Sequence, residues 1–278
     1  MKLGVFTVML PDLTPEEAVT ALKQEGYDGV EWRVAQVPSG RQDETPSFWG
    51  NNLCTLEPTQ AEAKRARDLA DSAGLELPNL GTYIDLGELD KVEAALAFAE
   101  TARSPHFRVG FGGFEGGYAE QFGAAQAFLD DVIGLTKGSD LKPLVEIHHG
   151  TLLPSASLAE RLLSRFSPDD VGVIHDAGNM AFEGFENYQL GLELLGPYLA
   201  HVHLKNARFV AGEGVQRAEW SPLEDGAVDF SKLLGALHGV GYDGWLVVED
   251  FSAARPSREA LRHNLKFVKT LLAASVSA

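Results

Sequence analysis

The chain has 278 residues, of which 45% are hydrophobic, and it carries a net charge of −17. The apolar fraction is ample for a folded core and excludes wholesale disorder, while the acidic surface disfavours binding to nucleic acids and to anionic membrane surfaces. Its single cysteine, Cys54, excludes an internal disulfide and a cysteine-based zinc cluster.

Short β-branched runs alternate with longer helical patterns along the whole chain. We expect eight strands, each followed by a helical segment, at residues 2–8, 29–34, 75–84, 106–111, 143–149, 171–177, 199–205 and 245–250. Such alternation implies parallel strands joined by crossover helices, and eight units of about 35 residues suit a closed barrel. The sequence therefore predicts a single (β/α)₈ TIM barrel as one domain over residues 1–278, with an open doubly wound sheet as the rival fold.

The N-terminus begins directly on the first expected strand. It lacks the order of charged, apolar and small residues that makes a signal peptide. No apolar run in the chain approaches the ~18 residues of a membrane span. We therefore expect a cytoplasmic protein that makes no use of a membrane.

Several predicted helices have recognisable capping residues at their ends. Thr14, Thr59 and Ser157 are each followed three residues later by glutamate, the pattern of a capping box at a helix start. Gly26 and Gly74 stand where helix C-caps are expected.

Two connections are unusually long, at about residues 35–57 and 206–228. Loops of this length are often functional. Both follow strands, so in a barrel both belong to the carboxyl-terminal face, where active sites lie. Trp220 lies on the second connection and is a candidate substrate contact, with a local packing anchor as the alternative.

Ionisable side chains cluster where the fifth to eighth strands end. Unpaired charge at the end of an apolar strand is costly and rare, so four such ends in succession indicate a site. The residues are Glu146 and His148, Asp176 and Asn179, His201, His203 and Lys205, and Glu249.

Adjacent strands of a barrel can direct one side chain each to a shared point above it. Three carboxylates meeting there would repel one another, and a divalent cation removes that cost. Glu146, Asp176, His203 and Glu249 form a set of three oxygen ligands and one nitrogen ligand. This set suits Mn²⁺, Mg²⁺ or Co²⁺, with Zn²⁺ as a further candidate.

The same stretches resemble the xylose-isomerase-like TIM-barrel superfamily, which contains sugar isomerases, epimerases and related enzymes. Residues 145–148 resemble its Glu-x-His strand, 176–179 its Asp-x-Gly-His turn, and 201–206 its His-x-His-x-Lys-Asp strand. Residues 225–230 and 241–249 resemble its closing unit. The resemblance extends over essentially the whole chain.

The resemblance implies a metal site formed by Glu146, Asp176, His203 and Glu249, with His201 as an alternative to His203. It also implies that the two glutamates transfer protons on opposite faces of a ketose, through a metal-stabilised enediolate. That chemistry is physically reasonable, because a cation polarises the carbonyl while carboxylates move the proton beside it.

The chain departs from the family pattern at two positions. Asn179 stands where the family often has histidine, and Asn206 where it often has aspartate. The branch that cleaves abasic DNA needs additional histidines to hold three zinc ions, so Asn179 and the charge of −17 both oppose a nuclease. Asn179 remains a candidate for hydrogen bonding to a substrate hydroxyl, with a turn residue as the alternative.

Further candidate substrate contacts each have a structural alternative. Glu31 and Arg33 end the second strand and either bind hydroxyls or neutralise each other. His148 either contacts substrate or is a structural histidine. Lys205 and Arg208 either meet an anionic group or balance acidic neighbours.

These observations predict a divalent-metal-dependent isomerase or epimerase for a keto-sugar or a sugar phosphate, with Glu146 and Glu249 as the catalytic pair. An inosose-type dehydratase with the same metal site and a non-catalytic sugar- or metal-binding barrel are the alternatives. The expected partner is a small sugar. A homodimer is a candidate assembly, because acidic barrel enzymes often pair.

Overall fold

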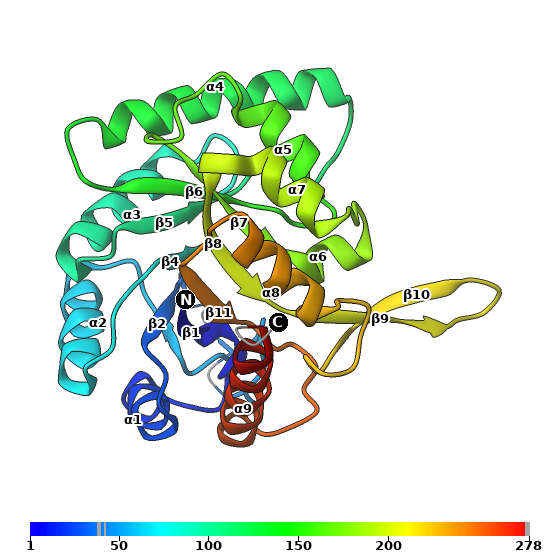
Figure 1. Ribbon diagram of the computed structural model, residues 1–278. Coiled ribbons are helices and arrows are strands. Elements are labelled where there is room, and N and C mark those ends of the chain that lie inside the picture. The colour runs from blue at the N-terminus through cyan, green and yellow to red at the C-terminus, as the bar shows by residue number, and fades with distance from the viewer. Residues whose placement is uncertain (38–39, 42, 276–278) are drawn as a thin grey trace.

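The computed structural model describes residues 1–37, 40–41 and 43–275. Within this part of the chain, eight parallel strands form a barrel that helices surround (Figure 1). The order around the sheet is β1 (Lys2–Phe6), β11 (Trp245–Val248), β8 (Leu199–Leu204), β7 (Gly172–Asp176), β6 (Lys142–Glu146), β5 (His106–Val109), β4 (Leu80–Thr82) and β2 (Gly29–Val34). Pairing of β1 with β2 as well as with β11 closes the barrel, so the predicted TIM barrel is confirmed and the open sheet is wrong.

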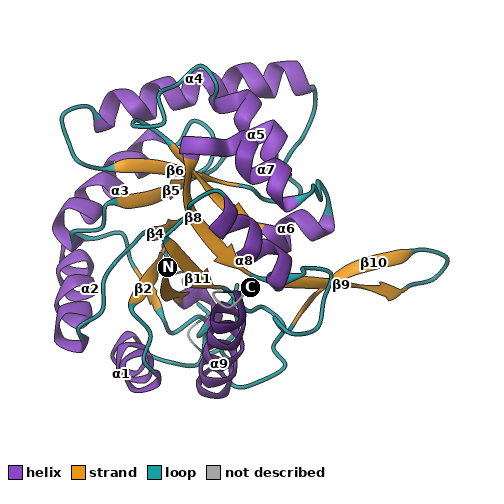
Figure 2. Cartoon of the chain, viewed as in Figure 1, coloured by secondary structure: helices purple, strands orange, loops and turns teal. Residues whose placement is uncertain are grey.

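Helices cover the outside of the strands, as the colouring of Figure 2 makes clear. They are α1 (Pro15–Glu25), α2 (Gln60–Ala73), α3 (Leu89–Ala102), α4 (Tyr118–Thr136), α5 (Ala156–Leu163), α6 (Ala177–Phe182), α7 (Tyr188–Leu195), α8 (Phe230–Gly239) and α9 (Ser257–Ser275), with short 3₁₀ turns at Thr7–Met9 and Gly196–Tyr198. Among the described residues, none of these helices is both long enough and apolar enough to cross a membrane.

The helix ends follow the expected local chemistry in most cases. Thr14 forms a complete capping box with Glu17, and the Thr59 hydroxyl accepts a hydrogen bond from the backbone of Glu62. Gly26 and Gly74 are C-caps in the left-handed region, with φ of 91° and 70°. The expected cap at Ser157 is wrong, because Ser155 caps α5 two residues earlier.

The third predicted strand is shorter than expected, and both long connections contain additional strands. Pro78 lacks the N–H that a strand ladder requires, and only Leu80–Thr82 of residues 75–84 is strand. The first connection adds β3 (Thr55–Leu56) to the edge of β2, while residues 38–39 and 42 within it lie outside the described residues. In the second, β9 (Asn206–Ala211) and β10 (Gln216–Ser221) form an antiparallel hairpin that extends away from the barrel (Figure 1).

Strand register aligns the residues of the candidate site. Asp176 of β7 pairs directly with His203 of β8, after a register shift at Val173 and Ile174. Phe6 is fully buried, and its ring lies 5.8 Å from the ring of His203. Gly81 is needed beside Phe6, because a Cβ atom there would come within 2.1 Å of the phenyl ring. The tightly packed ring of Phe6 therefore supports the imidazole ring of His203.

Candidate metal centre and active site

Four side chains from neighbouring strands converge at the carboxyl end of the barrel. Glu146 ends β6, Asp176 ends β7, His203 lies near the end of β8, and Glu249 directly follows β11. One potential ligand atom from each lies within 4.8 Å of the others, and we call these residues the carboxylate–imidazole cluster. The Nδ1 atom of His203 lies 3.2 Å from Glu146 and 3.8 Å from both Asp176 and Glu249.

The local fold leaves one oxygen of Asp176 available to the cluster. Its Oδ1 accepts a hydrogen bond of 2.8 Å from the backbone N–H of Asn179 and thereby caps α6. Gly178 lets this turn pack against the end of β8, because a Cβ atom there would lie 2.6 Å from the backbone carbonyl of Lys205. Oδ2 of Asp176 therefore faces the ammonium group of Lys205, at 2.8 Å.

Two cationic side chains form ion pairs with different carboxylates of the cluster. Arg108 of β5 forms an ion pair with Glu146 and donates a hydrogen bond of 3.0 Å to the carbonyl of Thr82. Lys205, which follows β8, contacts both Asp176 and Glu249. Its Nζ also lies 5.0 Å from the ring of Trp220, within range of a cation–π interaction. The cluster thus has an Arg108 side and a Lys205 side.

The two glutamates of the cluster differ in their protonation equilibria. Burial raises the pKa of Glu146, but the charges of Arg108 and His203 outweigh burial and hold that pKa well below its ordinary value. Burial raises the pKa of Glu249 to about 7, and the charges of Lys205 and His203 oppose this rise only in part. Glu249 can therefore bind and release a proton near neutral pH, whereas Glu146 stays ionised.

A cavity of about 550 Å³ opens above the cluster. Its floor contains Glu146, Glu249, Arg108 and Lys205, and its walls combine aromatic side chains with a few polar groups. The wall residues include Trp49, Thr82, Tyr83, Asp85, Phe111, His148, His149, Trp220 and Phe251. This mixture is typical of a pocket for a small organic ligand.

Three of the predicted substrate contacts line this cavity: His148, Lys205 and Trp220. The Nδ1 atom of His148 donates a hydrogen bond of 2.7 Å to the carbonyl of His149. Because Nδ1 carries the hydrogen, Nε2 of a neutral His148 is left as an acceptor. Burial lowers the pKa of His148 and favours this neutral form.

The other four predicted contacts lie outside the lining of the cavity. Asn179 is buried and donates a hydrogen bond of 3.2 Å to Glu146, so it holds that carboxylate in place without lining the cavity. Arg33 donates a hydrogen bond to Thr55, and Arg208 forms ion pairs with Glu219 and Asp225 on the hairpin. Glu31 is fully buried and faces His201 and His203. Direct substrate contact by these four residues stays a prediction.

Sequence reasoning overlooked several residues around the cluster. Arg108 was visible as a charged residue inside an apolar strand, a pattern that indicates a buried partner. Tyr83 and Phe251 carried no comparable signal, because aromatic residues near strand ends are ordinary core residues. Their place in the cavity wall follows from barrel closure.

The cluster has the chemistry of a divalent-cation site. It supplies three carboxylates and one imidazole nitrogen, all buried, at the carboxyl ends of four strands. Hard oxygen ligands with one imidazole suit Mn²⁺, Mg²⁺ or Co²⁺, and Zn²⁺ also accepts such a set. The donor set therefore fits the metal that the sequence predicts.

The fold and this cluster define a parallel (β/α)₈ barrel with a carboxylate-rich centre at its carboxyl end. The family described as xylose isomerase-like TIM barrel matches residues 19–271, and the chain belongs to that family.

Two of the curated relatives that match part of the chain are inosose dehydratases. The chain is 30% identical over 132 residues to an inosose dehydratase of Geobacillus thermodenitrificans, a match covering 41% of this chain and 43% of that protein. An inosose dehydratase of Erwinia tasmaniensis is 34% identical over 137 residues, covering 42% and 45%. Each match spans less than half the length of the relative.

Solved structures of the same architecture cover nearly the whole chain. A crystal structure of the IolI protein with a zinc atom superimposes with a TM-score of 0.78 at 14% identity, covering 99% of both chains. A D-tagatose 3-epimerase-like protein superimposes with a TM-score of 0.75 at 16% identity, covering 100% of this chain and 99% of the other. At these identities the likeness establishes the fold.

Proposed function

We propose that this protein is a divalent-metal-dependent isomerase or epimerase that acts on a keto-sugar. The observation that carries the proposal is the presence of Glu146 and Glu249 together in the floor of one cavity, within a cluster that also contains Asp176 and His203. Two carboxylates beside a bound ketone can remove and return the proton on the carbon next to the carbonyl.

Glu146, Asp176, His203 and Glu249 would hold the metal. When bound, a divalent cation supplies Lewis-acid stabilisation of negative charge on substrate oxygen atoms. Oxygen ligands leave such a cation able to accept substrate oxygens, which suits a vicinal hydroxy-ketone.

The side chains around the cavity would transfer protons, hydrogen-bond the substrate and contact its apolar faces. Glu249 lies in the cavity floor beside Lys205, so it is placed to take a proton from one face of the substrate and to release it again. Glu146 would act from the other side of the cluster, where Arg108 stabilises its charge. Lys205 and His148 offer a hydrogen-bond donor and an acceptor to substrate oxygens, and Trp49, Tyr83, Trp220 and Phe251 provide apolar surface for the C–H faces of a sugar.

A second candidate is a dehydratase for a keto-inositol, and the curated relatives favour it, since inosose dehydratases match at 30% and 34% identity. The first step is the same: a carboxylate removes the proton next to the carbonyl. The outcomes then diverge, because a dehydratase expels the hydroxyl on the next carbon as water, whereas an epimerase returns the proton to the same carbon.

The deciding experiment follows ketoses, ketose phosphates and keto-inositols in D₂O, with Mn²⁺ or with EDTA. Manganese-dependent deuterium incorporation without loss of water supports the isomerase or epimerase. Manganese-dependent loss of water, with the absorbance of an enone, supports the dehydratase. Absence of both reactions, with a melting temperature that a sugar still raises, contradicts both enzymes and supports a binding protein.

A further inference from the structure

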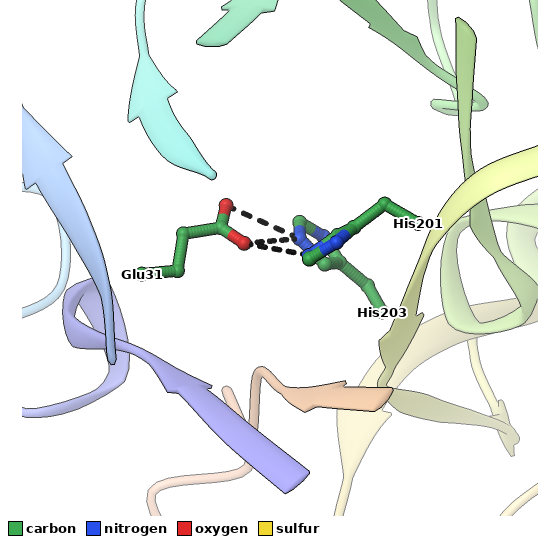
Figure 3. Close-up of side chains that lie close together, drawn as sticks. All are labelled: Glu31, His201 and His203. Carbon is green, nitrogen blue, oxygen red and sulfur yellow. Dashed lines mark hydrogen bonds and ion pairs between the residues drawn. The ribbon is translucent and has the colours of Figure 1, made fainter. Parts of the chain in front are cut away.

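A second group of polar side chains lies in the barrel interior, beneath the carboxylate–imidazole cluster. Glu31 of β2 reaches across to His201 and His203 of β8 (Figure 3). All three side chains are completely buried. Oε2 of Glu31 lies 2.8 Å from Nε2 of His201 and 3.3 Å from Nε2 of His203. The amide of Asn79 donates a hydrogen bond of 3.0 Å to Oε1.

These contacts determine which nitrogen atoms of the two histidines carry hydrogen. An ionised carboxylate can only accept, so Nε2 of each imidazole must be the donor. The other nitrogen of His203, Nδ1, faces Glu146, Asp176 and Glu249, and in the metal-free protein it donates a hydrogen bond of 3.2 Å to Glu146, so a metal ion would take the place of this hydrogen. His203 thus connects the two groups, with one nitrogen directed to each.

His201 has no such second connection. Its Nδ1 atom is buried without a hydrogen-bond partner among the described residues. His201 and His203 therefore share the contact with Glu31 but differ in their access to the cluster. This difference makes His201 a natural control for His203.

We propose that Glu31 is a positioning residue that holds the Nε2–H of His203 and so presents Nδ1 as a metal ligand. The inference rests on the metal site of the proposed function. A carboxylate that accepts the outer N–H of a ligating histidine fixes both the tautomer and the ring orientation, and loss of such a contact typically weakens metal binding about 10- to 100-fold.

The decisive variant is Glu31→Gln, which keeps the size of the side chain. Asn79 donates to Oε1, so the oxygen of the new amide stays toward Asn79 and its NH₂ group faces the histidines. Nε2 of His203 lies 3.3 Å from both carboxylate oxygens of Glu31, so an amide N–H in place of one oxygen weakens the preference for hydrogen on Nε2 and lets it lie on Nδ1, where a metal ion would bind. We expect the Kd for Mn²⁺, measured by titration calorimetry, to rise about 10- to 100-fold.

The matched control is His201→Gln, whose amide can still donate to Glu31. We expect its Kd for Mn²⁺ to stay within about threefold of the wild-type value, because His201 presents no atom to the cluster. Equal weakening by both variants would mean that Glu31 acts through packing alone, and the inference would be wrong. Unchanged Mn²⁺ binding by Glu31→Gln would overturn it as well.

A spectroscopic readout on the wild-type protein avoids any question of variant folding. In the zinc-loaded protein, long-range ¹H–¹⁵N spectra should show hydrogen on Nε2 of His203 and none on Nδ1. Zinc bound at Nε2, or a second metal ion bound by Glu31, His201 and His203, would contradict the inference. Failure of wild-type protein to bind Mn²⁺, Co²⁺ or Zn²⁺ would instead overturn the metal-dependent function itself.

Discussion

The two sides of the cluster hold their glutamates in different ways. On the Arg108 side, Glu146 has a guanidinium partner, and Asn179 and His203 also contact its carboxylate. On the Lys205 side, Glu249 shares one ammonium group with Asp176. The charge of Arg108 helps to hold the pKa of Glu146 low, whereas burial raises the pKa of Glu249 to about 7 and Lys205 opposes that rise only in part.

This difference separates two tasks that one residue type performs in the same site. A carboxylate with a dedicated cation is a stable, permanently charged anchor. A buried carboxylate that shares its cation has a higher pKa and can be protonated near neutral pH. In the metal-free protein Glu146 is therefore a charged partner of Arg108, whereas Glu249 titrates near neutral pH.

The largest effect is expected on turnover. Glu146→Gln and Glu249→Gln should each lower kcat by about 10²- to 10⁴-fold on the substrate identified in the D₂O assay, because each removes a carboxylate that transfers a proton. Retained turnover in both single variants would remove the proton-transfer assignment.

The same two variants should differ in stability. Glu146→Gln leaves the buried charge of Arg108 without its carboxylate, and loss of one partner of a buried ion pair costs about 3–5 kcal/mol. Glu249→Gln removes a carboxylate whose pKa burial raises, so we expect the metal-free protein at pH 8 to be unchanged or more stable. Urea denaturation of both variants measures the contrast, and equal destabilisation would contradict the two-sided description.

The raised pKa of Glu249 predicts a pH dependence of stability in the metal-free protein. Between an ordinary value of 4.5 and the folded value of about 7, the unfolded chain releases this proton while the folded protein retains it. The contribution of Glu249 is therefore fully present below pH 4.5 and is lost as pH rises through 7, a loss of about 3 kcal/mol. Comparison of the wild type with Glu249→Gln across this range isolates it, and parallel curves would show that Glu249 does not titrate there.

A smaller effect should follow from removing the ammonium group. Lys205→Met takes a positive charge away from Asp176 and Glu249. Two cations near the same carboxylates repel each other, so we expect the affinity for Mn²⁺ to rise about tenfold. Lys232→Met, on the exposed face of α8, is the matched control and should leave the Kd unchanged. A weaker Mn²⁺ site in Lys205→Met would show that Lys205 supports the metal rather than competes with it.

The smallest effect is expected on the hairpin. Arg208 is exposed, and its ion pairs with Glu219 and Asp225 are open to solvent. Exposed ion pairs contribute little, so Arg208→Ala should leave kcat/KM within about twofold and the denaturation midpoint unchanged. A large rise in KM would restore Arg208 as the substrate contact that the sequence predicts.

The order of strands and helices could be predicted from the sequence, as could the strand ends whose ionisable side chains converge. Glu146, Asp176, His203 and Glu249 could be predicted because parallel strands direct their carboxyl ends to one face of a barrel. The N-cap at Thr14 and the C-caps at Gly26 and Gly74 could also be predicted, since each depends only on neighbouring residues in the chain.

The pairing of these groups depends on the tertiary fold and could not be predicted from the sequence. Glu31 and His201 are 170 positions apart in the chain, and Arg108 and Glu146 are 38 apart, so no local pattern connects them. Barrel closure brings them into contact and excludes water from them. Burial and the nearest charge then set the protonation of each group, which is why two glutamates at equivalent strand ends behave differently.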